Sequence, residues 1–241
     1  KAVAVTAQQG ESAVFDDGPM PVKTRSTAQG VFELLCGEIV LNQLKPLDPI
    51  REGQIAERIG VSRTPVREAL LRLADLGLVD IYPQSGTRVA PIRIEKVRAA
   101  QLIREAVEVE IVGRAALDAD AETLARLEAL VDDQRIAAGR GDIRRLFELD
   151  EAFHRAIFAA AGFLSVSEEL EDLRVHLDRL RYISVAWPRP AEFIVREHTA
   201  ILAGMAARDA AAAAAAMRAH LRAVLAPLAI LSQDIPQAAS G

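Results

Sequence analysis

Residues 61–73 read Val-Ser-Arg-Thr-Pro-Val-Arg-Glu-Ala-Leu-Leu-Arg-Leu, and they decide how the N-terminal part of the chain folds. Ser62 is a favourable N-cap, and Pro65 falls in the first helical turn, where its missing N–H costs little. Arg63, Thr64 and Arg67 lie near the N-terminus of the expected helix, the end that recognition helices present to DNA bases. The opposite side must face a core, because apolar residues recur there at helical spacing: Val66, Ala69, Leu70 and Leu73.

The segments on either side of this helix predict a helix-turn-helix with a wing. Residues 54–59 form a short helix ended by Gly60, and a turn of about three residues joins the two helices. Gly77 ends the second helix. Two β-rich runs follow, at 79–82 and 87–90, separated by a Pro-Gln-Ser-Gly turn. We expect them to form a two-stranded wing beside the phosphates or the minor groove.

The run from Val61 to Leu70 resembles the GntR family of bacterial transcription regulators, whose winged-helix domain carries the same residues at every one of these positions. The resemblance implies binding to double-stranded operator DNA. By it, four residues would contact the DNA and Gly86 would mark the tip of the wing; the four are Ser62, Arg63, Thr64 and Arg67. The alternative is a surface-exposed basic helix in some other all-helical protein.

Composition predicts a mainly helical protein of two domains. The chain has 241 residues, of which 51% are hydrophobic and 4% aromatic, and alanine is abundant. No apolar run approaches the length of about 20 residues that crosses a membrane, and the first residues lack a signal-peptide layout. The single Cys36 is expected to pack in the interior and fits a reducing compartment. These features favour a cytoplasmic protein.

The charges are unevenly spread along the chain. The formal net charge is −5, yet residues 23–93 hold ten Lys/Arg and eight Asp/Glu, a net charge of +2. The remainder holds nineteen against twenty-six, a net charge of −7. The predicted DNA-binding half is therefore basic relative to the other half, and a dimer would double its phosphate contacts.

The chain divides into three expected segments. Residues 1–24 form a mobile tail, residues 25–92 the winged helix-turn-helix, and residues 93–235 an antiparallel helical bundle. The expected helices of the bundle span roughly 94–118, 121–138, 142–161, 165–184, 190–206 and 208–232, with breaks near Gly139–Gly141, Gly162, residues 187–190 and residues 208–209.

All four histidines fall in the helical half. Asp150 and His154 are four residues apart, so on a helix they lie on one face, one turn apart, as two ligands for a metal ion. His198 and His220 are 22 residues apart, about 33 Å along a straight helix. They meet only if an antiparallel helix pair turns near Asp209, the midpoint. His176 also lies 22 residues after His154, and its role stays open between a ligand, a pocket residue and an interior histidine.

This half resembles the FCD ligand-binding domain of the FadR-type branch of the GntR family, over roughly residues 95–232. The resemblance rests on three matches: Asp150-Glu151-Ala152-Phe153-His154, Glu197-His198 and Ala219-His220-Leu221. It implies a divalent metal held by Asp150, His154, His198 and His220. Zinc is the first expectation, with Ni²⁺ and Mn²⁺ as alternatives for this mixed imidazole and carboxylate set.

The resemblance also implies a small organic acid as effector. Arg104 matches an arginine that relatives use on acidic ligands, and a guanidinium clamps a carboxylate with paired hydrogen bonds. A solvated salt bridge from Arg104 to Glu108 is the alternative. Arg181 is a weaker candidate for the same role.

These features together predict a homodimeric transcription regulator, a repressor controlled by a small carboxylate, and not an enzyme. A metallohydrolase is a weaker alternative, because the sequence has no His-Glu-x-x-His motif and no nucleophile signature. A third possibility is that the metal is purely structural and the helical domain only dimerises.

Overall fold

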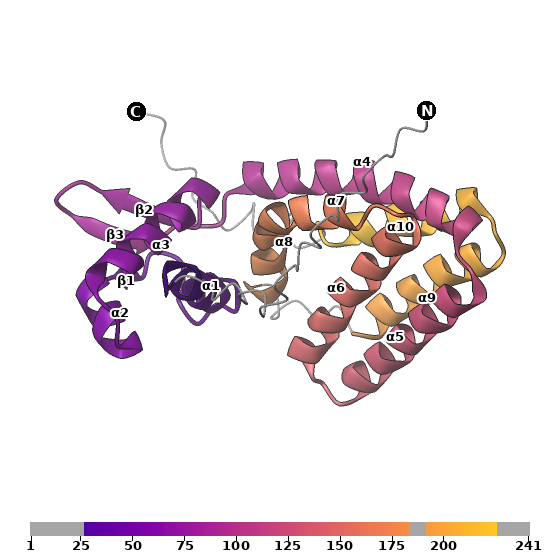
Figure 1. Cartoon of the computed structure of the whole chain (residues 1–241), viewed down its shortest axis with the longest axis horizontal. Coiled ribbons are helices and arrows are strands. Elements are labelled where there is room, and N and C mark those ends of the chain that lie inside the picture. The colour runs from indigo at the N-terminus through magenta and orange to yellow at the C-terminus, as the bar shows by residue number, and fades with distance from the viewer. Residues whose placement is uncertain (1–26, 184–190, 226–241) are drawn as a thin grey trace, which may run out of the picture.

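The computed structural model describes residues 27–183 and 191–225. Within these ranges the protein is mainly helical, with a small sheet near the N-terminus, which confirms the expected fold class. Figure 1 shows an N-terminal unit at one end and a bundle of helices at the other, with helix α4 running along the bundle from the junction. Three sequence-based expectations lie outside the described residues: the tail 1–24, the break at 187–190 and the helix beyond residue 225.

The N-terminal unit is a winged helix-turn-helix. Its elements are α1 (Thr27–Val40), β1 (Pro49–Ile50), α2 (Glu52–Ile59), α3 (Arg63–Leu76), β2 (Val79–Tyr82) and β3 (Gly86–Val89). The two expected wing strands pair antiparallel, with Tyr82 opposite Gly86. A third strand, β1, pairs with the other side of β3, so the sheet order is β1-β3-β2. A strand of two residues is too short to produce a periodic pattern in the sequence.

The helix that carries the expected reading residues begins and ends where the sequence indicates. Ser62 has extended backbone angles at the N-cap position, although its side chain makes no capping hydrogen bond. Gly77 ends the helix in the left-handed region, with φ of 79°, which glycine adopts at little cost. The four apolar residues of the inner face are buried: Val66, Ala69, Leu70 and Leu73. Cys36 lies half-buried on α1, against this core.

The bundle consists of seven helices in the described part of the chain. They are α4 (Ile94–Asp118), α5 (Ala121–Gly139), α6 (Ile143–Ala160), α7 (Leu164–Glu169), α8 (Glu171–Ile183), α9 (Glu192–Ala206) and α10 (Ala210–Ala223). The sequence predicted one helix over 165–184, which is wrong in one respect. The segment is divided at Leu170 into a short α7 and a longer α8. None of the described helices combines the length and apolar composition needed to cross a bilayer.

Helices α9 and α10 form the antiparallel pair that the histidine spacing predicts. The Asp209 side chain accepts a hydrogen bond from the Ala212 N–H, which caps α10 just after the turn. The two helices then run very close together. A Cβ built on Gly204 would lie 2.6 Å from the backbone nitrogen of Ala213, so only glycine fits at this crossing.

Helix α8 lies between the two parts of the molecule. Val175 packs into the hydrophobic core of the N-terminal unit. His176 Nε2 donates a hydrogen bond to the Leu76 carbonyl at the end of α3, at 2.8 Å. The buried Arg179 Nη2 donates to the Ala90 carbonyl just after β3. One helix of the bundle therefore contacts both the end of α3 and the end of the wing.

Candidate metal and ligand site

Three helices bring one carboxylate and three imidazoles together in the interior of the bundle. Asp150 and His154 come from α6, His198 from α9 and His220 from α10. All four are buried, and their nearest ligand atoms lie within 4.8 Å of one another. The structure thus brings together every member of the set that the sequence singled out. The turn at Asp209 places His198 and His220 at one level, with their Nε2 atoms 3.3 Å apart.

A hydrogen-bond acceptor faces the Nδ1 atom of each histidine. His154 Nδ1 lies 2.6 Å from Glu108 Oε2, and His220 Nδ1 lies 2.9 Å from Glu197 Oε2. His198 Nδ1 lies 2.7 Å from the amide oxygen of Gln134, whose NH₂ group donates to the Leu149 carbonyl and so fixes the orientation of the amide. Acceptors at these positions favour the tautomer with its proton on Nδ1, which turns an Nε2 lone pair inward.

The inward atoms crowd one point. His154 Nε2 and His220 Nε2 are 3.1 Å apart, and Asp150 Oδ1 lies 3.4 Å from His198 Nε2. Lone pairs this close repel unless a cation lies between them. Ligands of a tetrahedral zinc ion at metal–ligand distances of about 2.0–2.1 Å are separated by roughly 3.3–3.4 Å. The donor set and its spacing fit a divalent metal.

The protonation states of the cluster also suit a cation. Burial lowers the pKa of His154 to about 4, although Glu108 opposes the shift. Burial and the neighbouring His220 hold the pKa of His198 well below its usual value. Burial alone would raise the pKa of Asp150, but Arg181 and the histidines outweigh it and keep the carboxyl ionised. At neutral pH His154 and His198 are therefore neutral imidazoles and Asp150 is a carboxylate, which are the forms that bind metals.

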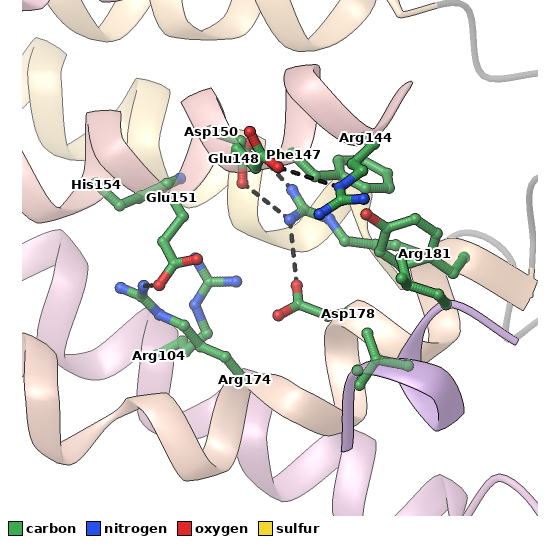
Figure 2. Close-up of a pocket in the computed structure, with 14 residues that line it drawn as sticks. Arg104, Arg144, Phe147, Glu148, Asp150, Glu151, His154, Arg174, Asp178 and Arg181 are labelled. Atoms are coloured by element: carbon green, nitrogen blue, oxygen red, sulfur yellow. Dashed lines mark hydrogen bonds and ion pairs between the residues drawn. The ribbon is translucent and has the colours of Figure 1, made fainter. Parts of the chain in front are cut away.

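A cavity of about 270 Å³ adjoins this centre and reaches the N-terminal unit. Asp150 and His154 form part of its wall, and Figure 2 shows arginines entering it from several sides. Helix α1 contributes Gly37 and Val40, and Leu41 directly after it also lines the cavity. The cavity therefore lies at the junction of the two parts of the chain.

The two arginines named from the sequence both line this cavity and both have carboxylate partners. Arg104 Nε donates to Glu108 Oε1 at 2.5 Å, and both side chains are almost fully buried. The alternative salt bridge therefore forms, although it is buried and not solvated. Arg181 donates to both oxygens of Asp150, at 2.8 and 3.1 Å, as the dashed lines of Figure 2 indicate. Arg104 acts on His154 through Glu108, and Arg181 orients Asp150.

The residues that sequence reasoning missed are those that orient the histidines. Gln134 lies on α5 and Glu108 on α4, far from the histidines in sequence, and no local pattern relates them to the cluster. Glu197 could have been noticed only because it directly precedes His198 in the sequence. His176 is not part of the cluster, since its ring contacts the Leu76 carbonyl at the junction instead. The interior-histidine alternative is the one that the structure supports.

The expected DNA-contacting residues all lie on the surface of the N-terminal unit. Ser62, Arg63, Thr64 and Arg67 are exposed at the first turns of α3, and Gly86 is exposed at the end of the wing. The guanidinium of Arg63 lies against the start of α2, since a Cβ added to Gly53 would be 3.3 Å from its Nη2 atom. One face of the unit thus presents an exposed helix N-terminus bearing two arginines.

Comparison with known families matches both parts of the chain. The family described as bacterial regulatory proteins, gntR family, matches residues 27–89. The FCD domain matches residues 101–223, which include the four-residue cluster.

Individual relatives cover most of the chain. The HTH-type transcriptional repressor RspR of Escherichia coli is 35% identical over 199 residues, which cover 83% of this chain and 87% of that protein. A probable D-xylose utilization operon transcriptional repressor of Paenarthrobacter nicotinovorans is 30% identical, over 84% of this chain and 89% of that protein. Among solved structures, E. coli McbR/YncC superposes with a TM-score of 0.70 at 25% identity, over 86% of this chain and 98% of that one.

Proposed function

The chain belongs to the gntR family of bacterial regulatory proteins and is a DNA-binding transcriptional regulator, not an enzyme, and from this premise we propose that it is a homodimeric repressor controlled by a small organic acid. We divide it into a DNA-binding domain, residues 25–92, and a metal-containing effector domain, residues 93–235. The observation that carries the proposal is the cavity between the two domains, which adjoins the Asp150 and histidine centre.

The N-terminal domain reads a palindromic operator with α3 in the major groove. The exposed positions of Ser62, Arg63, Thr64 and Arg67 support this assignment, and Gly86 would bring the wing tip close to the DNA backbone. Two copies of the reading helix are needed for a two-fold symmetric site. Exposed apolar side chains on α4, with Leu102 71% and Ile103 39% exposed, offer a surface that a second protomer would cover.

We expect Arg67→Ala to weaken operator binding by about 1–3 kcal/mol, because a lost bidentate contact with a base costs that much. Duplexes selected from a randomised pool with the full chain provide the operator, and fluorescence anisotropy gives its affinity. Arg126→Ala is the matched control, since Arg126 is an exposed arginine on α5 in the other domain. Equal affinities of the Arg67 variant and the wild type would refute the assignment of α3 as the reading helix.

The effector domain holds a divalent metal, and zinc fits its donor set best. Asp150, His154, His198 and His220 would be the ligands, with Glu108, Gln134 and Glu197 orienting the imidazoles. A bound metal would supply positive charge at one wall of the cavity. The mixed imidazole and carboxylate set also accepts Ni²⁺ or Mn²⁺.

The organic acid binds in the cavity beside this centre and changes operator affinity by favouring one arrangement of the two domains. Four protein ligands also complete a tetrahedral zinc shell, and that observation favours a second possibility, a purely structural metal. Operator titrations with metal-free and zinc-loaded protein separate the two. Weakening of DNA binding by a carboxylate only in loaded protein supports sensing at the metal, whereas equal weakening in both forms assigns the metal a structural role.

A further inference from the structure

One contact between the two domains lies at the C-terminal end of the reading helix α3. Leu76 is the last residue of this helix, and Gly77 follows in the left-handed region. The carbonyls of a last turn have no partner within their helix and form the negative end of its dipole. Four basic side chains of the effector domain gather around this end and the adjacent end of the wing. We call them the junction clamp: Arg93, Lys96, His176 and Arg179.

Two residues of the junction clamp come from α8 and donate to backbone carbonyls of the DNA-binding domain. His176 Nε2 lies 2.8 Å from the Leu76 carbonyl oxygen, and Arg179 Nη2 lies 2.5 Å from that of Ala90, just after β3. Arg179 is 1% exposed, and burial lowers its pKa to about 10, so it stays charged at neutral pH. Its hydrogen bond is therefore charge-assisted and shielded from water, which strengthens it. Because both acceptors are backbone atoms, the helix and the wing themselves are held.

The other two residues of the junction clamp come from the start of α4 and contact the turn after α3. Arg93 forms an ion pair with Asp80 on β2. A Cβ added to Gly77 would lie 3.6 Å from Arg93 Nη1 and 3.8 Å from Lys96 Cε, so both side chains lie over this turn. The three other cations all lower the pKa of His176, although less than burial does, which places the four groups near one another.

The junction clamp has a common base, because α4 and α8 pack together through a small core. The members of this core are fully buried: Val97, Ala100, Leu177 and Leu180. Figure 1 shows α8 and the start of α4 on the side of the bundle that faces the N-terminal unit. The four basic side chains therefore contact α3 and the wing from one packed unit.

The position of the junction clamp gives it control over the direction of α3. Val175 also joins the two domains, but its apolar contact is non-directional, whereas hydrogen bonds depend on angle. The reading side chains lie at the opposite end of α3, which has 14 residues and is about 21 Å long. A tilt of about 10° at the junction clamp would therefore move the reading end by roughly 3–4 Å, about the rise of one base pair.

We propose that the junction clamp is a positioning device, which fixes the direction of α3 against the bundle and so sets the half-site spacing that the dimer accepts. The inference rests on the proposed function, since it needs a homodimer held through its bundles on a palindromic operator. It deepens that function by assigning specificity for operator spacing to residues at the far end of α3 from the reading side chains. Without the junction clamp, each N-terminal unit turns about Val175 and accepts several spacings.

Binding of the full chain to duplexes of altered spacing tests the proposal. The selected operator is compared with versions that carry one or two extra base pairs between the half-sites, and with a lone half-site. One extra base pair displaces the second half-site by about 3.4 Å and rotates it by about 35°. We expect the wild type to bind each longer version at least about tenfold more weakly, because the second half-site then has a low effective concentration.

Arg179→Met removes the charged donor and keeps an apolar side chain in the interior. We expect this variant to bind the selected operator roughly three- to thirtyfold more weakly than the wild type, and the longer versions within about threefold of the selected one. Arg179→Lys keeps a charged donor and should retain the spacing preference. Arg126→Met changes an exposed arginine on α5 and should match the wild type. A variant that was merely less stable would bind every duplex more weakly by the same factor.

A double variant, Arg93→Gln with Lys96→Met, decides the question if Arg179→Met does not fold, since neither side chain is buried. It should also bind the longer versions within about threefold of the selected operator. An unchanged spacing preference in the folded variants overturns the inference and leaves the proposed function standing.

The wild type separates the remaining outcomes. If it prefers the palindrome to a lone half-site yet accepts every spacing, the inference alone is overturned. If it binds the lone half-site as tightly as the palindrome, the homodimeric part of the proposed function falls together with the inference.

Discussion

At the scale of single residues, the centre depends on which ring nitrogen of each histidine faces inward. Gln134 and Glu197 each accept from one Nδ1 atom. A Glu108 carboxylate oxygen lies 2.6 Å from His154 Nδ1, so groups on three different helices adjoin the three rings. Phe153 stacks on His198 with ring centroids 4.2 Å apart and closes that side of the centre. The proposed donor atoms are therefore already held in place, which would strengthen binding of a metal ion because little order has to be imposed.

We expect Glu197→Gln to lower zinc affinity by about 10–100-fold, because groups that orient a ligating histidine contribute that much. The amide can present its NH₂ group to His220 Nδ1 and so favour the wrong tautomer. Competition with a chromophoric chelator measures the affinity. Glu192→Gln, at an exposed position on the same helix, is the control. Unchanged affinity in the Glu197 variant would contradict the role assigned to this contact.

The stability of the metal-free protein should fall as the pH drops below about 6.5. Burial lowers the pKa of His154 to about 4, and burial also lowers the pKa of His176. Between the unfolded pKa of about 6.5 and the folded value, the unfolded chain binds protons that the folded chain excludes, so the unfolded state gains. The stability contribution is complete above pH 6.5 and is lost toward pH 4.

Urea unfolding of metal-free protein at pH 7.5 and pH 5.5 measures this effect. We expect the free energy of unfolding to be lower at pH 5.5, with His154 alone contributing about 1 kcal/mol. His154→Gln should reduce the difference. Equal stabilities at the two pH values would mean that the buried histidines accept protons in the folded state.

At the scale of helices, the centre requires the close crossing of α9 and α10. Gly204 allows the two backbones to approach, and the turn capped by Asp209 sets the register that aligns His198 with His220. The same capping pattern recurs at Asp120 and Asp142, before α5 and α6. Side-chain caps thus mark the starts of α6 and α10, two of the three helices that carry the cluster.

Gly204→Ala should therefore destabilise the protein by about 1–3 kcal/mol, since the added methyl group would meet the backbone of Ala213 and force the helices apart. Gly30→Ala, on α1 in open space, should instead be neutral or stabilise by up to about 1 kcal/mol. Thermal unfolding of both variants provides the comparison. A Gly204 variant as stable as the wild type would show that the crossing can relax without loss.

Helix positions and the two pairs of the cluster, Asp150 with His154 and His198 with His220, could be predicted from local spacing. The joining of the two pairs into one set came from the family resemblance. The caps and glycines located α3, and the equal spacing about Asp209 placed His198 and His220 together. Features that depend on contacts between distant segments could not be predicted this way. The two-residue β1 exists only through pairing with β3, and Leu170 divides α7 from α8 without a glycine or proline to mark it.

The same limit applied to the arginines. Arg104 stood out because of its match to a family motif, yet in the structure Glu108 holds it. Arg179, whose side chain reaches the Ala90 carbonyl, lies in an ordinary amphipathic helix and gives no signal in the sequence. Which arginine reaches the DNA-binding domain depends on how α8 packs against that domain.

At the scale of the whole molecule, α8 connects the cavity to the DNA-binding domain. Arg174 and Arg181 line the cavity, while His176 and Arg179 donate to carbonyls at the ends of α3 and of the wing. With Val175 in the core of the N-terminal unit, a displacement of α8 would move the reading helix with it. Figure 1 shows this helix between the two parts of the chain. A ligand bound in the cavity would therefore act on α3, and so on operator affinity, through this one helix.

Elemental mass spectrometry of tag-free protein tests the proposed metal centre most directly. The comparison is between the wild type and a His198→Ala, His220→Ala double variant, each incubated with Zn²⁺ and then dialysed. We expect close to one equivalent of zinc per chain in the wild type and almost none in the variant, with operator binding retained where the variant stays folded. A wild type that holds no zinc, nickel or manganese after the same treatment would contradict the account and leave the buried histidines without a metal.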